Sequence, residues 1–151
     1  MRLQFLNKYK VSELQSAEVT ELERKVGEMA RFEKFEDILA WQKAFALTLE
    51  IYKITTNTHF AKDFGLKDQI RRASVSVMAN IAEGHGRKSN IEFANFLNIA
   101  RGSAAEVQSH LHIASGLGYI SQEEFECSYF LLTEISKMTL ALAKYLRDST
   151  N

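Results

Sequence analysis

The sequence predicts an all-α protein: an antiparallel, up-down-up-down four-helix bundle with an extra N-terminal helix. Its 151 residues include no proline, which breaks helix interiors, and only seven glycines. From about residue 35 onward, apolar residues recur at spacings of three and four, the pattern of amphipathic helices. The links between these stretches are short, which favours antiparallel neighbours.

The length suits one domain, which we place at residues 35–149, and leaves residues 1–34 as an N-terminal extension. Val19, Leu22, Val26 and Met29 have a heptad-like spacing within this extension. The pattern covers barely two heptads, fewer than a stable coiled coil requires. We expect either an accessory helix that packs on the bundle or on a neighbouring subunit, or a mobile extension.

The first two bundle helices are expected at about residues 35–55 and 66–83, with a loop at 56–63. Gly84 and Gly86 are expected to end the second helix, because glycine tolerates the left-handed cap conformation. The predicted buried face of the first helix is Ile38, Trp41, Phe45, Leu49 and Tyr52, widened by Leu47, Ile51 and Ile54. That of the second is Leu66, Ile70, Ala73, Val77 and Ile81.

Two capping-box patterns, at residues 89–92 and 121–124, predict the starts of the third and fourth helices. Gly116 and Gly118 are expected to stop the third helix after about Ser115. Its predicted core face is Phe93, Phe96, Leu97, Ala100, Ala104, Val107, Leu111 and Ala114. The fourth contributes Phe125, Tyr129, Leu132, Ile135, Leu142 and Leu146, and carries further apolar residues at Phe130, Leu131, Met138 and Leu140. Such surplus apolar surface indicates a subunit interface.

Composition narrows the class of protein. Nineteen Lys and Arg balance nineteen Asp and Glu, which excludes a protein that is basic all over. The single cysteine, Cys127, fits a reducing compartment. The first ten residues are too polar for a signal peptide, and no apolar run approaches the ~20 residues of a membrane span. We therefore expect a cytoplasmic protein with no membrane partner.

A row of polar residues marks the second and third helices. Arg72, Ser76, Asn80 and Glu83 share one helix face, and Ser103, Glu106 and His110 share another. If these helices are antiparallel neighbours, Arg72 and Glu106 are expected to pair, with Ser103 and Asn80 filling the remaining sites. We interpret this polar row as a structural feature that fixes helix register.

The segment 62–101 carries seven basic and four acidic residues, a local charge of +3. Within it, Arg71, Arg87, Lys88 and Arg101 are candidate nucleic-acid-binding residues. Arg87 and Lys88 precede a helix start, where backbone amides favour phosphate. A solvated loop with two ordinary charges is the alternative, and no aromatic platform for bases is evident among these charges.

The sequence gives little support for catalysis. A di-iron bundle needs Glu-x-x-His pairs, and none occurs, since Glu106 and His110 are four apart. Phosphate-binding and dinucleotide-binding fingerprints are absent. We predict no enzyme, no catalytic residue, no cofactor and no metal site.

Three stretches are distinctive: 35–43 (FEDILAWQK), 69–84 (QIRRASVSVMANIAEG) and 96–106 (FLNIARGSAAE), followed by Leu117-Gly118-Tyr119-Ile120. Across about Phe35 to Arg147 they resemble the bacterial four helix bundle protein family, also called the 23S ribosomal RNA intervening-sequence or S23 family. The resemblance implies a subunit of a ring-like homopentamer, encoded within ribosomal RNA gene insertions or as a free-standing gene. A related protein, the accessory variability protein of diversity-generating retroelements, is a basic pentamer that binds nucleic acid and a reverse transcriptase, whereas this chain is neutral.

The sequence thus predicts a non-enzymatic homo-oligomer with two alternative roles. The first is binding RNA, DNA or a nucleic-acid-processing protein through basic residues near the second and third helices. The second is a protein–protein scaffold that binds no nucleic acid.

Overall fold

A computed structural model describes residues 32–150 of the chain. Its four long helices are α3 (Leu39–Ile54), α5 (Phe64–His85), α6 (Asn90–Gly116) and α7 (Gln122–Asp148). A 3-10 helix, η1 (Phe35–Asp37), precedes α3, and a short helix, α4 (Thr58–Lys62), joins α3 to α5. The predicted N-terminal helix falls on residues outside the described range.

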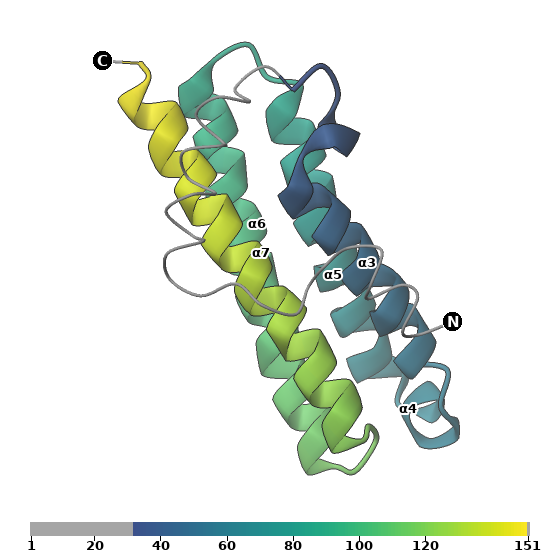
Figure 1. The fold of residues 1–151 in the computed structure, drawn as a ribbon. Coiled ribbons are helices and arrows are strands. Elements are labelled where there is room, and N and C mark those ends of the chain that lie inside the picture. Colours follow the sequence, from purple (N-terminus) through teal and green to yellow (C-terminus); the bar gives the residue numbers. More distant parts are fainter. Residues whose placement is uncertain (1–31, 151) are drawn as a thin grey trace. The chain divides into compact units, whose positions relative to one another are not determined.

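The long helices alternate in direction and form an antiparallel bundle (Figure 1). Each packs against two others, in the order α3, α5, α6, α7 and back to α3, so that α3 and α6 are diagonally opposite. The predicted all-α bundle is confirmed. No helix within residues 32–150 combines the length and hydrophobicity that a membrane span needs.

Serine caps start α6 and α7 where the sequence predicts. Ser121 and Glu124 form a complete capping box, in which the Glu124 amide donates to Ser121 Oγ (3.1 Å) and the Ser121 amide to Glu124 Oε2 (2.8 Å). At α6 the Glu92 amide donates to Ser89 Oγ (3.2 Å). Glu92 reaches back to the Ser89 hydroxyl rather than to its backbone amide, at 2.9 Å.

The ends of α5 differ from the prediction. α5 begins at Phe64, two residues early, because the Asp63 side chain caps it by accepting from the Leu66 amide (3.1 Å). The expected loop before it contains α4. Gly84 does not end α5, which continues to His85, and Gly86 caps the helix in the right-handed region (φ −73°).

Gly84 instead lies inside α5, where α5 approaches α6. A Cβ at this position would lie 2.7 Å from Cβ of Phe96 and 2.8 Å from Cδ2 of Phe93. Such distances are too short for any side chain, so the helices approach this closely only because residue 84 has none.

The predicted buried face of α3 is wrong for three of its five residues, whereas Ile38 is buried and Trp41 is half-buried as part of it. Phe45, Leu49 and Tyr52 are 37, 46 and 43 % exposed. The residues expected only to widen the face, Leu47, Ile51 and Ile54, are the ones in the core, together with Ala40 and Ala44. The spacing identified residues that share a face but not the face that the bundle covers.

The other three helices bury most of the faces that their patterns predict, and the remaining predicted residues, Leu66, Phe96, Phe125 and Tyr129, are half-buried. Ile70, Ala73, Val77 and Ile81 of α5 are buried, and so are Phe93, Leu97, Ala100, Ala104, Val107, Leu111 and Ala114 of α6. On α7, Leu132, Ile135, Leu142 and Leu146 are buried. Of its surplus apolar residues, Leu131 and Met138 also join the core, whereas Phe130 and Leu140 stay 41 and 49 % exposed.

We expect Gly84→Ala to lower the free energy of unfolding by about 1–3 kcal/mol, because the added methyl group forces Phe93 and Phe96 to move. Gly102→Ala is the matched control, since it too lies within a helix but a Cβ there meets no atom within 4 Å. That variant is expected to gain about 0.5–1 kcal/mol from helix propensity. Urea unfolding of both proteins is the measurement, and equal midpoints would contradict the close approach.

Candidate functional site

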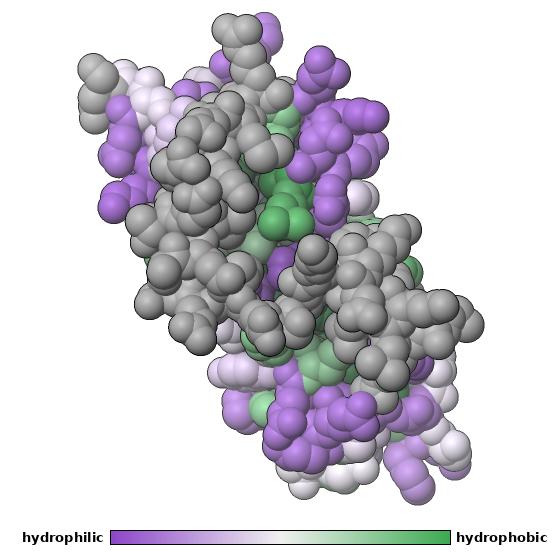
Figure 2. All heavy atoms as spheres, in the orientation of Figure 1, coloured by the Kyte–Doolittle hydropathy of each residue, from purple (hydrophilic) through white to green (hydrophobic). Residues whose placement is uncertain are grey.

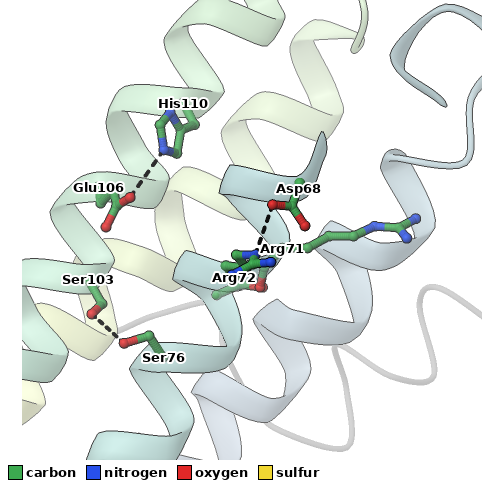
Figure 3. Close-up of polar contacts among 8 residues, drawn as sticks. Asp68, Arg71, Arg72, Ser76, Ser103, Glu106 and His110 are labelled. Carbon is green, nitrogen blue, oxygen red and sulfur yellow. Dashed lines mark hydrogen bonds and ion pairs between the residues drawn. The ribbon is translucent and has the colours of Figure 1, made fainter. Parts of the chain in front are cut away.

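The predicted polar row is formed in part between α5 and α6. The hydroxyls of Ser76 and Ser103 lie 2.8 Å apart and hydrogen-bond across the two helices (Figure 3). The Asn80 side-chain amide donates to the backbone oxygen of Ser76 (2.8 Å) and to its hydroxyl (3.0 Å). These three side chains are partly buried and satisfy one another, which fixes the register of the two helices.

The expected pair of Arg72 with Glu106 does not form. Arg72 Nε lies 2.8 Å from Asp68 Oδ2, one turn earlier on α5. Glu106 Oε1 lies 3.4 Å from Nε2 of His110, one turn later on α6 (Figure 3). Each charged residue uses the partner four positions away on its own helix, which requires no second helix to hold it.

The four candidate nucleic-acid-binding residues do not form one patch. Arg71 extends from α5 toward α3 (Figure 3), where its Nε donates to Thr55 Oγ1 (2.8 Å). Arg101 lies on α6, and its Nη1 is 3.4 Å from Asn98 Oδ1. Since Asn95, one turn before Asn98, contacts Arg147 of α7, this side of α6 faces α7 rather than α5.

Arg87 and Lys88 lie in the α5–α6 turn, at the end of the bundle away from α4 (Figure 1). The Arg87 guanidinium hydrogen-bonds to Glu83 Oε1 and lies 4.7 Å from the centre of the Phe96 ring. Lys88 is exposed beside it. Of the two basic side chains predicted here, Arg87 is therefore held by Glu83 of α5, and Lys88 is exposed.

Two buried charges that the sequence analysis did not single out lie between α3 and α7. Lys43 of α3 is 3 % exposed and Glu134 of α7 is 4 % exposed. Lys137 approaches Glu134 from the same helix, with Nζ 3.8 Å from Oε1. In the sequence, such a site shows only as a charged residue among apolar ones. The two residues cannot be paired from the sequence, because they lie on the first and last long helices of the bundle.

Burial lowers the pKa of Lys43 below that of an ordinary lysine, and attraction to Glu134 raises it again in part. An unfolded chain then binds more protons than the folded one at pH values between the lowered pKa and the ordinary value of about 10.5. The free energy of unfolding therefore rises with pH across this window.

The turn before α5 is tied to the α6–α7 turn. The Tyr119 hydroxyl donates to Asp63 Oδ2 (3.2 Å), and the Tyr119 ring packs on buried Phe60 with centroids 5.4 Å apart. Burial and the Asp63 carboxylate together raise the pKa of Tyr119. This contact positions the start of α5, because Asp63 also caps the helix there.

The described residues contain no group of three or more His, Cys, Asp or Glu side chains placed to hold a metal ion. The site features found in the described residues are thus a satisfied polar row, a buried charge pair and dispersed basic side chains.

The model of the family described as "23S rRNA-intervening sequence protein" matches residues 36–141 of the chain. A crystal structure from Bacteroides thetaiotaomicron, described as a protein of unknown function from the S23 ribosomal protein family, is similar to the bundle. The two are 31 % identical, with a TM-score of 0.64 over 70 % of this chain and 98 % of the other. No curated protein matches the chain.

Replacing Glu134 by leucine is expected to lower the free energy of unfolding at neutral pH by about 3 kcal/mol, because it leaves Lys43 buried without its counter-charge. The pKa of Lys43 then falls further, so stability should rise with pH from a lower starting value than in the wild type. The double variant Lys43→Met, Glu134→Leu should recover most of the loss. Urea unfolding at about pH 7 and about pH 9 is the measurement.

Lys144→Gln, which changes an exposed charge on the same helix, is the control and should stay within about 0.5 kcal/mol of the wild type. A double variant as unstable as the single one would contradict the pairing of the two charges.

Proposed function

Because the chain belongs to the family of 23S rRNA-intervening sequence proteins, we propose that it is a non-enzymatic bundle that assembles into a ring of identical subunits and binds nucleic acid. The observation that carries self-assembly is the distribution of exposed apolar side chains on the bundle. Binding of nucleic acid rests on local charge and on the family.

Large exposed apolar residues lie on all four long helices, and most of them are on the diagonally opposite helices α3 and α6. On α3, Phe45 and Leu49 are 37 and 46 % exposed, one turn apart on the outer face. On α6, Ile99 and Ile113 are 52 and 47 % exposed, about four turns apart on its outer face. Figure 2 shows hydrophobic residues reaching the surface beside hydrophilic ones on the face turned to the viewer. Exposed large apolar residues on an outer helix face are candidates for association sites.

The placement of these two faces on different helices favours a head-to-tail contact over a two-fold dimer. A two-fold dimer uses the same patch on both copies, whereas a head-to-tail contact joins two different patches and forms a ring when the rotation between copies closes. If α3 of one copy packs on α6 of the next, each subunit uses both faces. The resemblance to the family supplies the expected number of five subunits.

Nucleic acid is the partner that the local charge supports. Lys88 precedes α6, whose N-terminal amides favour anions, and the ring would repeat this lysine in every subunit. Repetition raises the effective affinity for a phosphate backbone even when each contact is weak. A protein–protein scaffold without nucleic acid is the competing role, and it becomes the better account if the assembled protein binds no RNA or DNA.

Self-assembly is tested by light scattering on eluted size-exclusion peaks. We expect a single oligomer for the wild type, and monomers for Leu49→Glu and for Ile99→Glu, because each buries a carboxylate in one half of the contact. Val75→Glu, at an exposed apolar position of α5, is the matched control and should stay oligomeric, since α5 takes no part in the proposed contact.

Mixing the two monomeric variants distinguishes the two symmetries. In a head-to-tail contact, the intact α3 face of Ile99→Glu fits the intact α6 face of Leu49→Glu, so the mixture should form a heterodimer. A wild-type protein that elutes as a monomer at micromolar concentration overturns the ring.

Binding to RNA is expected to weaken as salt rises, in proportion to the number of phosphates contacted. Lys88→Gln should lower the slope of log affinity against log salt by about one per contacting subunit. Arg87→Gln should change it less, since Glu83 already balances that charge. Fluorescence anisotropy with labelled RNA at several salt concentrations is the measurement, and equal effects of the two variants would contradict this assignment.

A further inference from the structure

We propose that the end of the bundle at α4 and the start of α5 binds the unpaired bases of a single-stranded nucleic acid. The surface consists of Tyr52, Phe64, Lys67 and Arg71, and we call it the aromatic–cation surface. This inference rests on the proposed nucleic-acid function. It adds a second binding surface and specifies a single strand as the ligand of that surface. Figure 1 places it at the opposite end of the bundle from Arg87 and Lys88.

Each aromatic ring on this surface has a cation over it. Lys67 Nζ lies 4.7 Å from the centre of the Phe64 ring, and Arg71 Cζ lies 4.5 Å from the centre of the Tyr52 ring. Phe64 is 73 % exposed and Tyr52 is 43 % exposed. The expectation that no aromatic ring lies among these charges is therefore wrong, because Phe64 lies on the same helix as Lys67, and the fold brings Tyr52 of α3 against Arg71.

The four residues lie on one side of the molecule. Phe64, Lys67 and Arg71 follow one another at spacings of three and four along α5, so they share a face. Arg71 then reaches across to α3, where its guanidinium contacts both the Tyr52 ring and Thr55. The resulting order across the surface is ring, two cations, ring.

The surface is held in place by its surroundings. Lys67 Nζ donates to the Ala61 backbone oxygen (3.0 Å), and Arg71 Nε donates to Thr55 Oγ1 (2.8 Å). Asp63, directly before Phe64, is fixed by the Leu66 amide and the Tyr119 hydroxyl. Because these contacts already order the side chains, binding a ligand costs little further conformational entropy.

The local charge suits a phosphate backbone. Residues 52–72 contain five Lys and Arg and two Asp, a net of +3 in a chain whose total is zero. Both aspartates are engaged, Asp68 by Arg72 at 2.8 Å and Asp63 by its cap and Tyr119. Glu50, just outside this segment, lies 3.8 Å from Lys53. Lys62 and His59 extend the surface as exposed side chains.

Exposed rings beside cations point to single strands rather than to duplexes. Unpaired bases stack on aromatic side chains and on guanidinium planes, while a duplex keeps its bases stacked on one another. Such stacking tolerates any base, because each base has a π-face. We therefore expect binding with little sequence preference.

Phe64→Ala in the full-length protein tests the inference. The measurement is the fluorescence anisotropy of a labelled single-stranded RNA of about 15 nucleotides and of the matching duplex as each is titrated with protein. Affinity for the single strand should fall about tenfold, the loss of one stacked base, while the dependence on salt stays unchanged because no charge is removed. Lys67→Gln should instead lower the salt slope by about one per contacting subunit.

Phe130→Ala is the matched control, since it removes an exposed phenylalanine from α7 and should bind as the wild type does. Wild-type affinity in Phe64→Ala, or equal affinity of the wild type for duplex and single strand, overturns this inference and leaves the proposed function standing. A wild type that binds neither RNA at low salt overturns both.

Discussion

The close approach of α5 to α6 at Gly84 is the constraint on which the rest of the bundle depends. Because residue 84 has no side chain, Phe93 and Phe96 pack directly on the α5 backbone. The same pair of helices is joined further along by the hydrogen bond between Ser76 and Ser103. Two fixed points along one helix pair determine its register, and that register decides which residues of α5 and α6 face outward.

Once α5 and α6 are fixed in this way, the outer faces of the bundle acquire different chemistry. The polar side chains near the α5–α6 contact satisfy one another, so that surface is occupied by structural bonds. Apolar surface remains on α3 and α6, which do not pack against each other within one subunit. Exposed rings and cations remain at the end where α4 turns into α5. The proposed assembly face and the proposed binding surface meet on α3, where Tyr52 shares the outer face of Phe45 and Leu49.

The fold was predictable from sequence where local signals decide the outcome. The capping residues Ser89 and Ser121 and the spacing of buried residues on α5, α6 and α7 gave the helices and their inner faces. On α3 the spacing of Phe45, Leu49 and Tyr52 was read as a core face, although the bundle leaves that face exposed. Periodicity shows which residues share a face but not what covers it. The site was predicted less well, since the contact of Arg71 with Tyr52 and the attraction between Lys43 and Glu134 involve residues far apart in the chain.

The burial of Lys43 against α7 also bears on how the chain folds as it is made. Lys43 and Glu134 are 91 positions apart, so the counter-charge of this lysine leaves the ribosome long after α3 does. At typical translation speeds the delay is about 5–20 s. Throughout this interval α7 is not available to cover the nascent α3, which can pack only on α5 as that helix emerges. Closure of the domain is therefore a late event in synthesis.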